Sequence, residues 1–199
     1  MKGYVIYLPE YESSCAMSKQ ALNSGKLHNW DLDLYAGVDG QKLNWDNTKL
    51  KINQTSAKCS AMMTKPGVQG CFMSHWQLWN LCADSDTTIG IFEHDIEFIG
   101  PIPNVEFEHL LKLEGFSLKK PRPAGEWYEG ARAYILKPAG ARLLINWVNK
   151  NGALPADVNI GLDVLNITLD TSNCIQQHEL HGKINKREQS FTWNLKGMK

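Results

Sequence analysis

Several features that mark other classes of protein are scarce or missing in this chain of 199 residues. It has only five cysteines, which are scattered and form no close metal-binding pair. No apolar run approaches the ~20 residues that a membrane-spanning helix needs. The N-terminal residues show no secretory signal, so we expect reduced thiols and a cytoplasmic protein. Internal repeats and low-complexity segments are missing as well, which excludes repeat architectures.

The chain also lacks an excess of either charge, since 21 basic residues balance 21 acidic ones. It therefore has no overall electrostatic attraction to nucleic acid or to an anionic membrane. A hydrophobic content of 43% is ordinary for a soluble globular protein. A chain of this length buries roughly 70% of its unfolded surface as one domain. We expect a single domain over residues 1–199 that ends in a polar tail at 182–199.

What the chain does contain is an alternation of strand and helix patterns. This alternation predicts an α/β fold with a largely parallel central sheet flanked by helices. The polar, irregular segment 41–66 predicts a surface excursion or a mobile loop. The predicted strands are 3–8, 31–36, 88–93, 131–136, 167–169 and 174–177. The predicted helices are 13–22, 69–83, 105–113, 138–151 and 156–165.

The most informative segment is TIGIFEHD at 88–95, an apolar run that ends in two carboxylates, Glu93 and Asp95. In an extended chain, side chains two residues apart lie on the same side, so these carboxylates can converge. A hard divalent ion such as Mg²⁺ or Mn²⁺ would relieve their repulsion. Open α/β sheets also bind ligands beyond the carboxyl ends of their strands. The alternative is a polar turn that only ends a core strand.

The segments GCFMSHWQLW (70–79) and IFEHDIEF (91–98) together resemble the centre of glycosyltransferase family 25. This family includes bacterial lipooligosaccharide galactosyltransferases and collagen galactosyltransferases. Three further segments are similar to the family pattern in order and spacing, namely AGVDG (36–40), GARAYIL (130–136) and LPAD (154–157). The resemblance implies a GT-A-like fold. It also implies transfer of a hexose, typically galactose from UDP-galactose, to a glycan or glycoconjugate acceptor with inversion.

The chain departs from the family pattern at two places. His94 stands where the family has the middle aspartate of its acidic triplet, and no arginine precedes Arg122. By the resemblance, Asp95 with help from Glu93 holds Mn²⁺ or Mg²⁺, and His178 is a further metal candidate by position. His94 either faces the base or ribose or is itself a Mn²⁺ ligand. The donor-binding candidates are Leu8, Val38, Asp39, Gly70, Ser74, His75, Glu93 and His94.

Inversion requires a base that takes the proton of the acceptor hydroxyl as it attacks. The resemblance makes Asp157 the first candidate and Asp163 the second. The alternative for Asp157 is a carboxylate that only stabilises a helix N-terminus. Trp127 and Tyr128 are candidates for stacking on the acceptor sugar. His75 lines the site or has a structural hydrogen-bonding role.

Three functions compete at this stage. The first is a metal-dependent glycosyltransferase. The second is a nucleotide-sugar or glycan-binding module that has lost catalysis with its altered triplet. The third is a hydrolase or nucleotidyltransferase that uses Glu93 and Asp95, which the missing glycine-rich phosphate loop disfavours.

Overall fold

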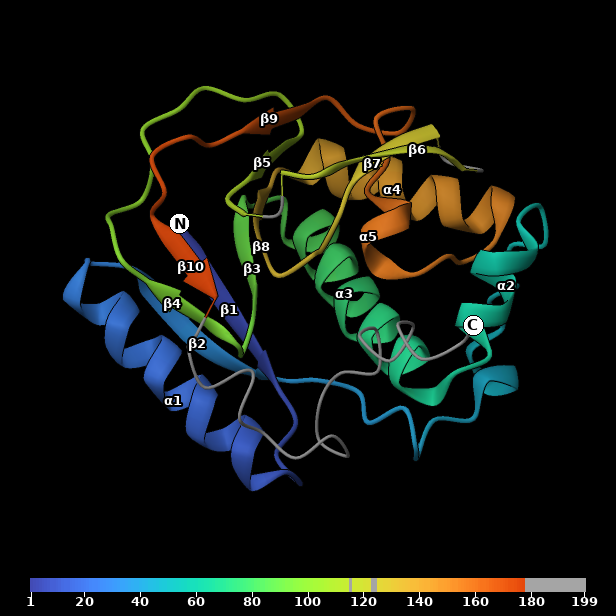
Figure 1. Cartoon of the computed structure of the whole chain (residues 1–199), viewed down its shortest axis with the longest axis horizontal. Coiled ribbons are helices and arrows are strands. Elements are labelled where there is room, and N and C mark those ends of the chain that lie inside the picture. Colours follow the sequence, from blue (N-terminus) through green and yellow to red (C-terminus); the bar gives the residue numbers. More distant parts are fainter. Residues whose placement is uncertain (115, 123–124, 178–199) are drawn as a thin grey trace.

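The computed structural model describes residues 1–114, 116–122 and 125–177 (Figure 1). The predicted α/β class with a mostly parallel central sheet is confirmed. Six strands form this sheet in the order β2-β1-β3-β8-β5-β9. They are β1 (Lys2–Tyr7), β2 (Asp31–Ala36), β3 (Ile89–Glu93), β5 (Leu110–Lys112), β8 (Ala133–Leu136) and β9 (Ile167–Leu169).

Strand β8 runs against the other strands of the central sheet. It is antiparallel to both β3 and β5, whereas the pairs β1–β2, β1–β3 and β5–β9 are parallel. Phe92 near the end of β3 pairs with Ala133 at the start of β8. The residues that enter β8 therefore lie at the edge where the parallel strands end, which is where open α/β sheets bind ligands.

Helices cover both faces of the sheet (Figure 1). The helices α3 (Pro66–Ser85) and α4 (Pro138–Asn151) each begin with a proline, which lacks only an N–H that the first turn leaves unbonded. The helix α1 (Glu12–Leu27) packs on β1, β2 and β4 (Ile96–Phe98). The remaining elements are the helices α2 (Ala57–Met63) and α5 (Ala156–Asn159), the 3-10 turn η1 (Trp45–Thr48) and the strands β6 (Leu118–Arg122), β7 (Gly125–Tyr128) and β10 (Ile175–Gln177).

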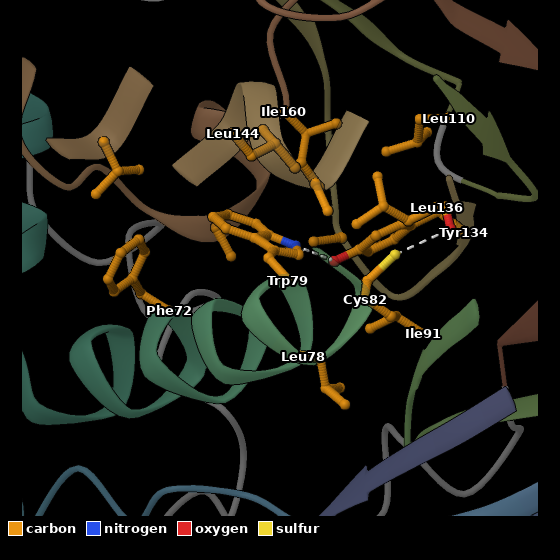
Figure 2. Close-up of a cluster of buried hydrophobic side chains, with 14 of the residues drawn as sticks. Phe72, Leu78, Trp79, Cys82, Ile91, Leu110, Tyr134, Leu136, Leu144 and Ile160 are labelled. Carbon is orange, nitrogen blue, oxygen red and sulfur yellow. Dashed lines mark hydrogen bonds between the residues drawn. The ribbon is translucent and has the colours of Figure 1, made fainter. Parts of the chain in front are cut away.

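The alternation of side chains along the central strands divides the core into two layers. Ile91 of β3 and Tyr134 of β8 pack toward α3 and α4, with Trp79 among the largest buried side chains there (Figure 2). Phe92 and Ile135 belong to the opposite layer with α1 and the β4–β10 pair. Because neighbouring residues of a strand face opposite sides, this arrangement requires apolar residues at every position, as in 89–92.

The structure corrects some expected elements. Residues 105–113 do not form the predicted helix but contain β5, because Leu110 and Leu111 supply one side chain to each layer of the core. The helix predicted over 156–165 is only α5, and a turn follows it. The segment 41–66 has more regular structure than its composition suggests, since it contains η1 and α2. Within the described ranges, no helix has the length and apolar character needed to cross a membrane.

Candidate functional site

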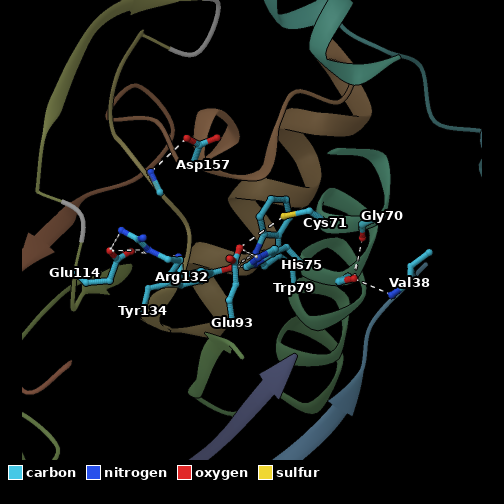
Figure 3. A network of polar contacts seen from close by, with 12 residues as sticks. Val38, Gly70, Cys71, His75, Trp79, Glu93, Glu114, Arg132, Tyr134 and Asp157 are labelled. Carbon is cyan, nitrogen blue, oxygen red and sulfur yellow. Dashed lines mark hydrogen bonds and ion pairs between the residues drawn. The ribbon is translucent and has the colours of Figure 1, made fainter. Parts of the chain in front are cut away.

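The first turns of α3 are joined closely to the loop that follows β2. A Cβ atom on Gly70 would lie 2.5 Å from the carbonyl oxygen of Val38, so only glycine allows this approach. Ser74 donates its hydroxyl to the Gly70 carbonyl at 2.8 Å and accepts from the Val38 N–H at 2.8 Å. The family-like residues Gly70, Ser74 and Val38 therefore form one structural junction (Figure 3).

A hydrogen-bonded chain of side chains leads from the core to Glu93 at the end of β3 (Figure 3). The Trp79 indole donates to the Tyr134 hydroxyl oxygen at 2.9 Å, and His75 Nδ1 lies 2.8 Å from the same oxygen. His75 Nε2 lies 3.4 Å from Glu93 Oε1. Trp79 can only donate, so a consistent assignment has the Tyr134 hydroxyl donate to Nδ1 and Nε2–H donate to Glu93. His75 is 1% exposed, and this chain holds its ring in place.

Cys71 adds a second contact to the same carboxylate. Its thiol donates to Glu93 Oε1 over 3.7 Å. The residue is partly exposed, but burial around the sulfur and the nearby carboxylates of Glu93 and Asp157 raise the pKa of the Cys71 thiol well above 9.0. The group is therefore a neutral thiol near pH 7 when no metal is bound. The Asp95 carboxylate also acts on this thiol.

The predicted extended geometry of residues 93–95 is wrong. Strand β3 ends at Glu93, and His94 and Asp95 form a turn before β4. Asp95 is 5% exposed and accepts from Gln177 Nε2 at 3.4 Å, whereas Glu93 contacts α3. The two carboxylates still act on common neighbours, because both interact electrostatically with Cys71 and with Arg132. His178 follows Gln177 in the sequence and lies outside the described residues.

An ion pair stands beside this turn. Arg132 donates to Glu114 Oε2 through Nε at 3.1 Å and through Nη2 at 2.7 Å, and its backbone N–H reaches Oε1 at 3.3 Å. Burial favours the neutral guanidine, but the Glu114 carboxylate, together with those of Asp95 and Glu93, outweighs burial and raises the pKa of Arg132. The sequence did not identify either residue, although Arg132 and Tyr134 stand two apart in a β pattern and so share a side of the strand.

Asp157 lies on α5 and is held by the segment that enters β8. Its Oδ2 accepts from the Gly130 N–H at 3.3 Å, and the buried Lys112 donates to the Gly130 carbonyl. Burial raises the pKa of Asp157, although the Gly130 N–H and the Lys112 charge oppose this effect. Burial lowers the pKa of Lys112 in turn. The charge of Glu93 is felt by both Asp157 and Lys112, so α5 and β3 contribute to one network.

Other predicted site residues have different surroundings. Asp163 is exposed in the turn after α5, and its carboxylate lies against Gly125. Trp127 is 5% exposed and packs with Cys59, Leu154 and Val158, so its ring is a core element. Its neighbour Tyr128 on β7 is partly exposed and has the more accessible ring.

The residues predicted to bind the nucleotide, on the loops after β1 and β2, make hydrogen bonds within the protein. Asp39 accepts from the Gln41 N–H at 2.9 Å, and its side chain is 9% exposed. The partly exposed Leu8 donates its N–H to the Ser14 hydroxyl at 2.9 Å. Both loops follow parallel strands at the edge that also carries Glu93.

The side chains at this edge of the sheet offer oxygen ligands that suit a hard divalent ion. Glu93 and Asp95 offer carboxylate oxygens, and both act on the same guanidinium of Arg132. That guanidinium donates to Glu114 through Nε and Nη2. Oxygen ligands of this kind fit Mg²⁺ or Mn²⁺.

Comparison with known proteins agrees with the family pattern of the sequence. The family model described as "Glycosyltransferase family 25 (LPS biosynthesis protein)" matches residues 2–114, which is more than half of the chain. A search of the curated proteins gives no match. Among solved structures, the chain is similar to a mutant Drosophila β-1,4-galactosyltransferase 7 in complex with manganese, UDP-Gal and xylobiose. This similarity has a TM-score of 0.46 and 12% sequence identity, and it covers 98% of this chain and 77% of that one.

Proposed function

Because the chain belongs to glycosyltransferase family 25, we infer that it transfers a hexose from a nucleotide-diphosphate donor to a glycan or glycoconjugate acceptor. UDP-galactose is the favoured donor, and the anomeric configuration inverts. One observation carries this inference. Glu93 ends β3 and Asp95 follows it in the turn, at the same edge of the sheet as the loops after β1 and β2. This is the position at which open α/β sheets bind ligands.

In the proposed reaction, Asp95 and Glu93 hold Mn²⁺ or Mg²⁺, and His178 is a further candidate ligand. When bound, such an ion neutralises the charge that develops on the departing diphosphate. The loops that carry Leu8, Val38 and Asp39 are candidates to contact the nucleotide. Tyr128 is the candidate for stacking on the acceptor sugar.

Asp157 is the proposed general base. The acceptor oxygen forms a bond to the anomeric carbon while the bond from that carbon to the diphosphate oxygen breaks. The proton of the acceptor hydroxyl moves to the Asp157 carboxylate, and the diphosphate leaves on the opposite face. Burial raises the pKa of Asp157 and so makes its carboxylate a stronger proton acceptor. Its contact with the Gly130 N–H orients the group.

His94 is the reason to consider a second candidate function, binding without catalysis. The family's middle carboxylate is missing at this position, which removes one negative charge from the triplet. A chain altered in this way can retain donor binding without turnover. The alternative is therefore a nucleotide-sugar or glycan-binding module with the same fold.

A screen of UDP- and GDP-sugars with Mn²⁺ tests both functions, with release of UDP or GDP and thermal stabilisation as the two measurements. We expect Mn²⁺-dependent stabilisation by UDP, because a ligand that binds only the native state stabilises it by mass action. Slow release of UDP from one UDP-hexose, with galactose favoured, identifies the transferase. Stabilisation without release from any donor supports the binding module, and the absence of both contradicts the two proposals.

The replacement Asp95→Asn sharpens this experiment. We expect it to abolish the Mn²⁺ dependence and to reduce UDP release by about 100-fold or more. Glu97→Gln is the matched control, since Glu97 lies two residues away and bonds only Gln176 in the contacts of the described chain. Unchanged UDP release by the Asp95→Asn protein would refute the assignment of the metal site.

A further inference from the structure

Cys71 and His75 stand one helical turn apart on α3, so their side chains project from the same side of the helix. Glu93 lies opposite them at the end of β3. Each of the three residues offers one metal-ligating atom, and these atoms all lie within 4.8 Å of one another. Two ligands at i and i+4 of a helix with a third from a neighbouring element is a frequent arrangement in metal sites.

Two of the separations between these atoms are close to those around a single tetrahedral ion. Cys71 Sγ lies 3.7 Å from Glu93 Oε1, and His75 Nε2 lies 3.4 Å from the same oxygen. Metal–ligand bonds of about 2.0 Å to nitrogen or oxygen and about 2.3 Å to sulfur place tetrahedral ligand atoms roughly 3.3–3.6 Å apart. The ligand atoms of Cys71 and His75 lie within 4.8 Å of each other, so binding of an ion would bring these two side chains closer together.

We propose that Cys71, His75 and Glu93 form a binding site for a thiophilic divalent ion of the Zn²⁺ class, with one coordination position open to solvent. A thiolate and an imidazole select such an ion over Mg²⁺, which prefers oxygen ligands. Three protein ligands with an open fourth position is the pattern of exchangeable zinc sites. The proposal does not rest on sugar transfer, although the site shares Glu93 with the proposed donor site.

The surroundings of the three ligands support this assignment. The outer ring nitrogen of a metal-bound histidine needs a hydrogen-bonding partner, and the Tyr134 hydroxyl lies 2.8 Å from His75 Nδ1. Trp79 fixes that hydroxyl from its other side. When Nε2 binds the ion, the ring proton resides on Nδ1 and is donated to the Tyr134 oxygen. The geometry of the ring is the same in both forms.

Charge and access also favour a cation at this place. The Glu93, Asp157 and Asp95 carboxylates act on the Cys71 sulfur and favour a positive charge beside it. Cys71 and Glu93 are both partly exposed, which gives an ion a path to the ligands. Binding forms a bond between the ion and sulfur, and the thiol proton leaves to solvent.

Titration of the metal-free protein with Co²⁺, followed by displacement with Zn²⁺, tests the proposal without any nucleotide. We expect one equivalent of Co²⁺ to produce a thiolate-to-cobalt charge-transfer absorption band. Cys71→Ser should remove the band and weaken Zn²⁺ binding by about 100-fold. Cys15→Ser is the matched control, because Cys15 is a partly exposed cysteine whose sulfur contacts only the Leu8 and Pro9 carbonyls among the described residues.

A second measurement uses the unaltered protein and so does not depend on whether a variant folds. In an alkaline buffer, which increases the reactive thiolate fraction of Cys71, excess Zn²⁺ should protect Cys71 from alkylation by iodoacetamide, read by mass spectrometry of its peptide, while Cys15 remains unprotected. No band with Co²⁺, an equal Zn²⁺ affinity of the Cys71→Ser protein, or unprotected Cys71 would each overturn the proposal. Failure of sugar transfer has no bearing on these readouts, so the two proposals fail separately.

Discussion

Two carboxylate regions flank the end of β3, and they differ in what compensates their charge. Glu114 receives three hydrogen bonds from Arg132, two of them from the guanidinium. Among the described residues, the hydrogen bonds to Glu93 and Asp157 come from groups other than Lys or Arg, namely the Cys71 thiol and the His75 ring for Glu93, and the Gly130 N–H for Asp157. The first region is neutralised within the protein and stabilises the fold. In the second, the charge of the buried Lys112 acts on both carboxylates, while its hydrogen bond among the described residues goes to the Gly130 carbonyl.

The largest expected effect tests the charge of the second region. Asp157→Asn should reduce turnover by about 10²–10⁴-fold, the contribution of a general base. The same change should raise the melting temperature at pH 7. Burial raises the pKa of Asp157, so the folded state favours the neutral form and a charged carboxylate there is destabilising at neutral pH.

The pH dependence of this stabilisation has a definite sign. The pKa of Asp157 is higher in the folded protein than in the unfolded chain, where it is about 3.9. Protonated Asp157 therefore stabilises the folded state fully below about pH 3.9, and this stabilisation is lost as the pH rises through the folded-state pKa. The melting temperatures of the Asp157→Asn and unaltered proteins should therefore converge near pH 3.5 and separate toward pH 7. Equal melting temperatures at pH 7 would contradict the burial argument. Loss of turnover in Asp163→Asn instead would assign the base to Asp163.

Glu114→Gln removes the ion pair of the first region. Glu93→Gln makes the same chemical change in the second region. We expect Glu114→Gln to lower the free energy of unfolding by about 3 kcal/mol, because the partly buried Arg132 loses its partner. Glu93→Gln should lower it by about 1 kcal/mol or less, since neutral donors can still reach an amide oxygen. Urea unfolding measures both values. Equal losses would show that the two regions do not differ as described.

An effect no larger than that of Glu114→Gln is expected in the chain of side chains that supports Glu93. Tyr134→Phe removes the acceptor of the buried Trp79 indole and the partner of His75 Nδ1, so it should lower the free energy of unfolding by about 1–3 kcal/mol. Tyr35→Phe is the matched control, because its hydroxyl makes an exposed bond to Gln77. We expect that control to change stability by about 0.5 kcal/mol or less. Urea unfolding measures the free energy of unfolding of both variants. An equal loss in Tyr134→Phe and Tyr35→Phe would contradict the proposed role of the buried chain.

The sequence predicted elements whose pattern is local. Helix α3 and strand β3 have strong periodicity or a continuous apolar run, and each was identified close to its observed bounds. The region 105–113 could not be assigned correctly, because Leu110 and Leu111 fit a helix face as well as a two-sided strand. The short strands β4, β6 and β7 were missed, since their pairing with β10 or with each other is not encoded in a local period.

The site was predictable only in part for the same reason. Glu93 and Asp95 stand out because they end an apolar run, and both lie at the expected edge of the sheet. Their joint geometry was not predictable, because the turn at 94–95 depends on β4 pairing with β10. Arg132 and Glu114 escaped notice, since a partner eighteen residues distant gives no pattern in a single sequence.

The position of β6 and β7 outside the central sheet has a consequence for how the sequence can vary. β6 and β7 form their own two-stranded ribbon just before β8, tethered to the remainder through the bridge between Trp127 and Gly161. Changes of length in β6 can therefore alter this ribbon without shifting the register of any central strand. Variation in this ribbon would change one border of the molecule on an unchanged central scaffold.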